Sequence, residues 1–131
     1  MNWDDFGVWS KHIADWGTQY HKTLRNRPVR AQTKPGEIAA QLPDSPPGQP
    51  EDMADILRDF EDIVMPGMTH WQHPRFFAYF PSNAAPASVL AEQLVNTVAA
   101  QCMLWQTSPA ATELEGRMID WLRQAMGLAD G

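Results

Sequence analysis

The sequence predicts a chain built of helices. Apolar residues recur at steps of three and four over several stretches, which is the spacing of one helix face. Eleven prolines separate these stretches and leave no room for long regular elements between them. Hydrophobic residues make up 44% of the 131 positions, so the chain is not a disordered tail. The expected fold class is therefore all-α.

Residues 3–25 are predicted to form the first helix. One stripe of this helix is apolar and rich in aromatic rings: Phe6, Trp9, Ile13, Trp16, Tyr20 and Leu24. Asn2 or Asp4 can cap its start, and Pro28 ends it. A stripe with so many large rings needs a partner. The partner is either a later helix of the chain or another subunit.

The next segment, residues 26–50, holds six prolines and two glycines and is expected to be a linker with one short helical turn at 37–42. A second helix is predicted over 50–65, because Pro50 suits the first helical position and Pro66 with Gly67 stops the helix. Its buried face is expected to hold Ile56, Leu57, Phe60, Ile63 and Val64.

Residues 68–85 are expected to be irregular, with a short extended piece at 75–80. A third helix is predicted from Pro86 to about Leu104. This stretch is rich in alanine and poor in charge, so we expect it to be buried on most sides, with Cys102 as a small buried apolar residue.

The fourth helix is predicted to begin with Ser108 as N-cap and Pro109 in the first turn, and to end near Gly127. Its stripe is Leu114, Met118, Trp121, Leu122 and Ala125. Met103 and Met118 are interpreted as core residues. Glu113 and Glu115 are interpreted as capping or surface charges, because residues two apart on a helix do not face each other.

The composition argues against several classes of function. Ten basic residues against sixteen acidic ones give a net charge of -6, which argues against nucleic acid. No apolar run is long enough for a membrane span, and a single cysteine makes a cytoplasmic location the default. His70 and His73 are spaced as a possible metal pair, but zinc sites need three or four ligands, so no metal site is expected. Six tryptophans predict a partner surface.

Several motifs together resemble one enzyme family. They are Met65-Pro66-Gly67, Thr69-His70-Trp71, Phe76-Phe77-Ala78-Tyr79-Phe80-Pro81, Ser108-Pro109-Ala110, Thr112-Glu113-Leu114-Glu115 and Asp120-Trp121-Leu122. With them the chain resembles the N-terminal part of the group II pyridoxal-phosphate (PLP) decarboxylases, the aromatic-L-amino-acid decarboxylase family. The likeness covers the whole chain, but the chain corresponds only to the beginning of such an enzyme.

The resemblance implies the helices of a PLP-dependent transferase fold of the aspartate-aminotransferase type, without its central sheet, in an intertwined homodimer. Residues 1–50 would be an N-terminal arm of helix and Pro-rich linker. Residues 51–131 would be helices and a substrate-pocket loop that lead into the large PLP domain. The expected partners are a second copy or that large domain, and an amino-acid substrate.

The resemblance also implies site residues. Tyr79, Phe80, Pro81 and Ser82 would line the pocket for the substrate side chain, with Trp71 in support. Ser82 stands where the family usually has Thr, whose hydroxyl faces the substrate and the cofactor phosphate. Gln101 and Met103 would reach the neighbouring subunit's pocket. Gln101 departs from the apolar or aromatic residues of members that make catechol and indole amines, which counts against an aromatic substrate.

Catalysis on PLP needs a Schiff-base lysine, and the chain has three lysines: Lys11, Lys22 and Lys34. None has a phosphate-binding context, and His21-Lys22 is interpreted as a surface pair of the first helix. No catalytic residue is therefore expected, and the chain alone is predicted to be inactive. The alternative is a stand-alone helical dimerisation module without catalysis. A third, weaker possibility is a regulatory decoy that pairs with an intact decarboxylase subunit.

Overall fold

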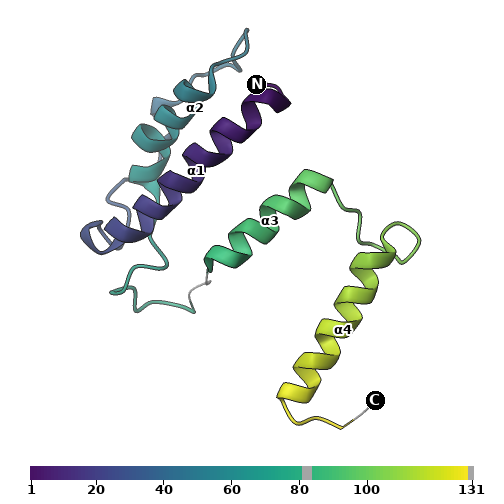
Figure 1. Ribbon diagram of the computed structural model, residues 1–131. Helices are drawn as coiled ribbons and strands as arrows, with labels where there is room; N and C mark the ends of the chain where they lie inside the picture. The colour runs from purple at the N-terminus through teal and green to yellow at the C-terminus, as the bar shows by residue number, and fades with distance from the viewer. Residues whose placement is uncertain (81–83, 130–131) are drawn as a thin grey trace. The chain divides into compact units, whose positions relative to one another are not determined.

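The computed structural model describes residues 1–80 and 84–129, and the chain divides into two compact units, Met1–Asn83 and Ala84–Gly131. Figure 1 shows four helices: α1 (Trp3–Thr23), α2 (Met53–Asp59), α3 (Pro86–Val98) and α4 (Pro109–Ala125). Shorter turns join them, and the described residues contain no strand. The all-α prediction is confirmed for these residues. None of the described helices has the length and apolar character that crossing a membrane requires.

Helix α1 begins at a reciprocal cap. The Asn2 side-chain oxygen accepts hydrogen bonds from the backbone N–H groups of Asp4 and Asp5, at 2.8 and 3.0 Å. The Asp5 carboxylate in turn accepts from the Asn2 N–H at 3.3 Å. Asn2 and Asp5 thus each accept a hydrogen bond from the other's backbone N–H, which is the arrangement of a capping box. A 3₁₀ turn, Leu24–Asn26, extends the helix to just before Pro28, so the predicted helix over 3–25 is confirmed.

Helix α2 starts later than predicted. Asp52 has an extended backbone and takes the N-cap position, which its residue type favours, so the helix begins at Met53 and not at Pro50. After Asp59 the chain widens into a π-helical turn, Phe60–Val64, and then tightens into a 3₁₀ turn, Met65–Gly67. The prediction of one uniform helix over 50–65 is therefore wrong at its start and in its regularity.

Helices α1 and α2 lie side by side in the first unit (Figure 1). The Trp16 ring meets the edge of Phe60 at a centroid distance of 5.3 Å, which is a favourable edge-to-face arrangement. The linker also packs here, since a Cβ placed on Gly67 would lie 3.0 Å from the Ile38 side chain. Ile38 directly precedes a 3₁₀ turn, Ala39–Gln41, which confirms the predicted helical turn at 37–42.

Helix α3 is shorter than predicted. Pro86 stands at its first position, and the Ser88 hydroxyl accepts from the Ala85 N–H at 3.1 Å. The helix ends at Val98 because Ala99 adopts a left-handed backbone with φ 49°. Its predicted end near Leu104 is wrong. Cys102 lies after the helix and is exposed, so its predicted burial on a helical stripe is also wrong for this chain by itself.

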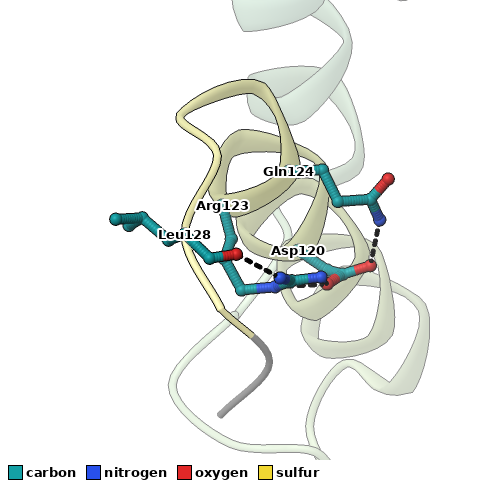
Figure 2. Close-up of polar contacts among 4 residues, drawn as sticks. All are labelled: Asp120, Arg123, Gln124 and Leu128. Atoms are coloured by element: carbon teal, nitrogen blue, oxygen red, sulfur yellow. Dashed lines mark hydrogen bonds and ion pairs between the residues drawn. The ribbon is translucent and has the colours of Figure 1, made fainter.

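Helix α4 ends in a Schellman motif. Gly127 has φ 68°, its N–H donates to the Gln124 carbonyl, and the Leu128 N–H donates to the Arg123 carbonyl. Figure 2 shows how the Arg123 side chain reinforces this end: it donates to the Leu128 carbonyl at 2.7 Å and pairs with Asp120 at 2.9 Å. The predicted end near Gly127 is confirmed. At the start of the helix, Ser108 occupies the N-cap position but its side chain makes no capping bond.

The apolar faces of α3 and α4 are open within this chain. The exposed large residues of these helices are Val89, Leu90, Leu94, Val95, Val98, Leu114, Met118, Ile119, Trp121 and Leu122. The expectation that the third helix is buried on most sides is not met by the chain's own residues. Met118, predicted to be core, is half exposed.

Candidate functional site

Three aromatic rings gather in residues 71–80, here called the aromatic loop. The Trp71 ring lies 5.0 Å from Phe76 and 5.8 Å from Tyr79, measured between ring centroids, and it stacks on Tyr79 with an interplanar angle of 22°. Tyr79 has a left-handed backbone with φ 37°, which is uncommon for a bulky residue. The predicted extended piece at 75–80 is therefore wrong, because the chain turns at Tyr79. The turn is what lets Tyr79 lie near Trp71.

The aromatic loop presents its rings to solvent. The exposed fractions are 83% for Tyr79, 90% for Phe77 and 98% for Phe80, while Trp71 is 43% exposed. Large apolar groups that are this open on a protein surface indicate a binding surface. Pro81 and Ser82, the two other residues predicted to line the pocket here, lie outside the described residues.

Two buried histidines hold the aromatic loop to the end of α1. Nδ1 of His70 lies 2.9 Å from the Tyr20 hydroxyl in a hydrogen bond, and the His70 N–H donates to the Val29 carbonyl, also at 2.9 Å. Nδ1 of His73 accepts from the Arg75 N–H at 3.0 Å. The proton of a neutral His73 is therefore on Nε2, which donates to the Arg25 carbonyl at 3.3 Å.

Burial at this contact favours the neutral forms of both its partners. Burial lowers the pKa of His70, and Arg27 and the nearby His73 lower it further by charge repulsion with the protonated form of His70. Burial also raises the pKa of the Tyr20 phenol, while the charge of Arg27 opposes that rise in part. The Arg27 guanidinium lies 5.2 Å from the centre of the Tyr20 ring, a cation–π distance.

The sequence did not indicate Tyr20 and Arg27 as parts of this site; it indicated His70 as part of a family motif, and His70 with His73 as a possible metal pair. The described residues hold no group of three or more side chains suited to a metal ion. The burial of a histidine can be predicted from sequence only if its hydrogen-bond partner is known. Tyr20 lies fifty positions away from His70. No short-range pattern could have connected them.

Gln101 and Met103 belong to the second unit, in the loop 99–108 that joins α3 to α4. The Gln101 carbonyl accepts from the Thr107 hydroxyl at 2.8 Å, and Met103 is 74% exposed rather than buried in a core. The Trp105 indole N–H donates to the Glu113 carboxylate at 2.9 Å. Glu113 therefore ties this loop to α4, which the expectation of a capping or surface charge did not include.

The three lysines of the chain are its candidates for a Schiff base with PLP. All three lysines are exposed, and Lys11 is paired with Asp15 on the outside of α1. Lys22 lies on the same helix, and the Lys34 N–H is bonded to the Glu37 side chain in the linker. A Schiff-base lysine needs a buried pocket that lowers its pKa. None of the three lysines is buried within this chain.

Relatives match this chain over nearly its whole length. The pyridoxal-dependent decarboxylase conserved domain matches residues 35–131. Aromatic-L-amino-acid decarboxylase of Manduca sexta is 42% identical over 130 residues, 99% of this chain and 26% of that protein. The solved structure of 4-hydroxyphenylacetaldehyde synthase from Rhodiola rosea is 41% identical with a TM-score of 0.92, over 98% of this chain and 28% of that one.

Another similar solved structure is tryptophan decarboxylase from Catharanthus roseus in complex with L-tryptophan. It is 33% identical to this chain with a TM-score of 0.92, over 98% of this chain and 28% of that one. The chain thus spans about a quarter of the length of the relatives it matches. The conserved domain and the identities agree with the motifs at residues 65–82 and 108–122. The chain belongs to the pyridoxal-dependent decarboxylase family.

Proposed function

We propose that this chain is the N-terminal portion of a PLP-dependent amino-acid decarboxylase. In that enzyme it contributes part of a dimer interface and one wall of the pocket for the substrate side chain. The observation that carries the proposal is the conserved-domain match over residues 35–131, together with 42% identity to a decarboxylase of which the chain spans 26%. The remaining three quarters of such a protein would supply the aspartate-aminotransferase-type sheet.

The uncovered apolar surface supports the interface role. Only two hydrophobic side chains among the described residues are buried, Leu24 and Met65. A chain of this composition normally covers far more, and open apolar faces of this kind are typical of surfaces that bind another protein body. We propose that residues 1–50 lie as an arm on a second subunit. Residues 51–131 lead into the large PLP domain.

The aromatic loop supports the pocket role. Trp71 and Tyr79 form a stacked pair, and Phe80, the next residue after Tyr79, has an exposed ring. Flat apolar faces of this kind suit a flat substrate side chain, because offset stacking contributes beyond burial alone. The family resemblance supports two further roles: the Ser82 hydroxyl would face the cofactor phosphate, and Gln101 and Met103 would reach the pocket of the neighbouring subunit.

The PLP cofactor supplies the electron sink for decarboxylation when it is bound in the complete enzyme. The lysine that holds it has to come from outside residues 1–131, since Lys11, Lys22 and Lys34 are all on exposed positions. We therefore expect the isolated chain to release no CO₂ from any amino acid. Its contribution to the reaction is to bind and orient the substrate side chain and to exclude water from it.

A chimera tests the proposal. This chain replaces the matching 26% of the Manduca sexta decarboxylase, and the unmodified enzyme and the enzyme lacking that portion serve as controls. We expect the chimera to be dimeric in light scattering, to show the visible absorbance of bound PLP and to release CO₂ from L-tyrosine, L-tryptophan or L-histidine.

The proposal is wrong if the chimera is dimeric and loaded with PLP yet releases no CO₂ from any of these amino acids. A 131-residue chain that forms a stable homodimer by itself, with a chimera that neither assembles nor binds PLP, would favour the stand-alone dimerisation module. A chain that instead joins the intact decarboxylase and lowers its activity would favour the decoy.

A further inference from the structure

The centre of the first unit is polar. Among the described residues only Leu24, Met65, His70 and His73 are buried, so half of the buried positions are histidines. The exposed fractions of His70 and His73 are 4% and 3%. A buried imidazole has to satisfy its nitrogen atoms, or it costs about 1–3 kcal/mol. Those hydrogen bonds therefore determine where the backbone next to each histidine lies.

Tyr20 holds the His70 side chain from outside the loop, while the Val29 carbonyl accepts from the His70 backbone N–H. The Tyr20 hydroxyl is 2.9 Å from Nδ1, and the two ring centroids are 5.6 Å apart. The Tyr20 ring is itself fixed, because it stacks on Trp16 at 5.4 Å with an interplanar angle of 13° and lies against the Arg27 guanidinium. A shift of the Tyr20 ring would disturb its contacts with Trp16 and Arg27 and its hydrogen bond to His70.

His70 is the residue directly before Trp71, and His73 lies three residues before Phe76. The Phe76 N–H donates to the His73 carbonyl at 2.8 Å, and the His73 N–H donates to the His70 carbonyl at 3.0 Å. Hydrogen bonds, joined through the covalent structure of His70 and His73, thus link the Tyr20 hydroxyl to the backbone that carries Trp71 and Phe76. The Tyr79 ring stacks on Trp71, which this backbone carries.

We propose that Tyr20 is a positioning residue: through its hydrogen bond to His70 it sets the place of the Trp71–Tyr79 stack against which the substrate side chain binds. Helix α1 is thereby part of the pocket's support as well as part of the proposed interface. The inference rests on the proposed function, because it takes the aromatic loop to be the substrate wall. The experiment below distinguishes failure of this inference from failure of the proposed function.

The chain offers a direct probe. It contains two tyrosines, Tyr20 and Tyr79, so fluorotyrosine labelling gives two ¹⁹F signals, and the variant Y20F leaves that of Tyr79 alone. Y20F removes the hydroxyl and keeps the ring with its contacts to Trp16 and Arg27. The matched control is T18V, which removes a hydroxyl on the same helix that donates to the Ala14 carbonyl.

In the 131-residue chain we expect Y20F to move the Tyr79 ¹⁹F signal toward that of free fluorotyrosine. T18V should leave the signal in place. H70L should act as Y20F does, while H70N, which puts an amide where Nδ1 was, should restore part of the wild-type shift. An unchanged Tyr79 signal in both Y20F and H70L overturns the inference, whatever the activity of any chimera.

The chimera supplies the second readout. Y20F should raise KM for a flat amino acid about three- to tenfold, the range for one lost buried hydrogen bond, with kcat within about twofold. Because Tyr20 acts through His70, the double variant Y20F/H70L should be no worse than H70L. A purely structural role would instead lower the amount of PLP-loaded enzyme and leave KM unchanged, and that result overturns the inference. An inactive wild-type chimera counts against the proposed function, and the ¹⁹F result then shows separately whether Tyr20 places Tyr79.

Discussion

The Trp16 indole N–H donates a hydrogen bond of 2.7 Å to the Glu61 carboxylate, and this bond joins α1 to the π-helical turn that follows α2. The same indole ring packs against Phe60 and Tyr20. One side chain therefore connects both helices of the first unit and the residue that holds His70. Bonds to a charged acceptor are stronger than neutral ones, although partial exposure reduces that advantage.

We expect W16F to destabilise the first unit by about 1–2 kcal/mol, because it removes this hydrogen bond and part of the ring contact. E61Q keeps an acceptor for the indole and should cost less than about 0.5 kcal/mol. Urea unfolding followed by far-ultraviolet circular dichroism measures both. Equal losses for the two variants would mean that the carboxylate charge, not the ring, carries the contact.

The stability of the first unit should depend on pH through His70. Its pKa is lowered below the usual value near 6.5, so the unfolded chain binds a proton first as the pH falls. The contribution of neutral His70 to the free energy of unfolding is complete above about pH 6.5. It is lost as the pH falls from 6.5 toward the lowered pKa of His70. The charged or titratable groups around His70 are Arg27, His73 and Tyr20, with His21 packed against the Tyr20 ring.

Urea midpoints measured between pH 5 and 8 test this expectation, with H70N as the control that removes the titrating group. The wild-type midpoint should rise with pH, and the H70N midpoint should rise less. R27Q removes a positive charge near His70. It should therefore raise the pKa of His70 and make the urea midpoint rise less with pH. A wild-type slope that H70N leaves unaltered would assign the pH dependence to another group.

The left-handed backbone of Ala99 is a strained end for α3. Because glycine adopts φ 49° without cost, A99G should stabilise the second unit by about 0.5–1 kcal/mol despite the greater freedom of the unfolded chain. A100G, one residue on and not in the left-handed region, should destabilise by about 0.4–1 kcal/mol. Thermal unfolding of the two variants gives the comparison. A loss in A99G as large as that in A100G would contradict the conformation described for Ala99.

The Trp105–Glu113 bond should hold the loop that carries Gln101 and Met103. In E113A we expect the amides of Thr107 and Ser108 to exchange with solvent about three- to tenfold faster, since the loop loses its side-chain tie to α4. E115A, two residues along the same helix, is the control. Hydrogen-exchange mass spectrometry or NMR measures these rates. Equal exchange in both variants would show that the Trp105 contact does not hold the loop.

Phe80 should matter for binding and not for folding. Because its side chain is 98% exposed, F80A should change the free energy of unfolding by less than about 0.5 kcal/mol. L24A, at a position that is 5% exposed, should cost about 2–4 kcal/mol. In the chimera, F80A should change the preference among amino acids. Loss of stability together with an equal loss for every amino acid would identify Phe80 as a core residue.

Local signals predicted the helices well where they were strong. The Asn2 cap and the aromatic stripe identified α1, and Pro109 with Gly127 identified both ends of α4. The predictions failed where backbone conformation, not residue type, decided the outcome. Alanine favours helix continuation, so nothing in the sequence indicates the left-handed Ala99 that ends α3. The π-helical turn after α2 likewise has no residue pattern of its own.

The candidate site was predictable only in part. The family motifs indicated Trp71 and Tyr79, which the structure brings together, but these motifs carry no information about what supports them. The Tyr20–His70 contact joins residues fifty positions apart, and a lone histidine within an irregular segment is compatible with many roles. The burial of His70 had to be known before its supporting role could be assigned. Conversely, Cys102 and Met103 looked like core residues because their type suggested it, although the helix ends before them.

The exposed apolar sides of α3 and α4 make the 131-residue chain by itself a substrate for chaperones and proteases and prone to self-association. In cells, a form of the chain in which these sides are covered should therefore persist longer than one in which they are open.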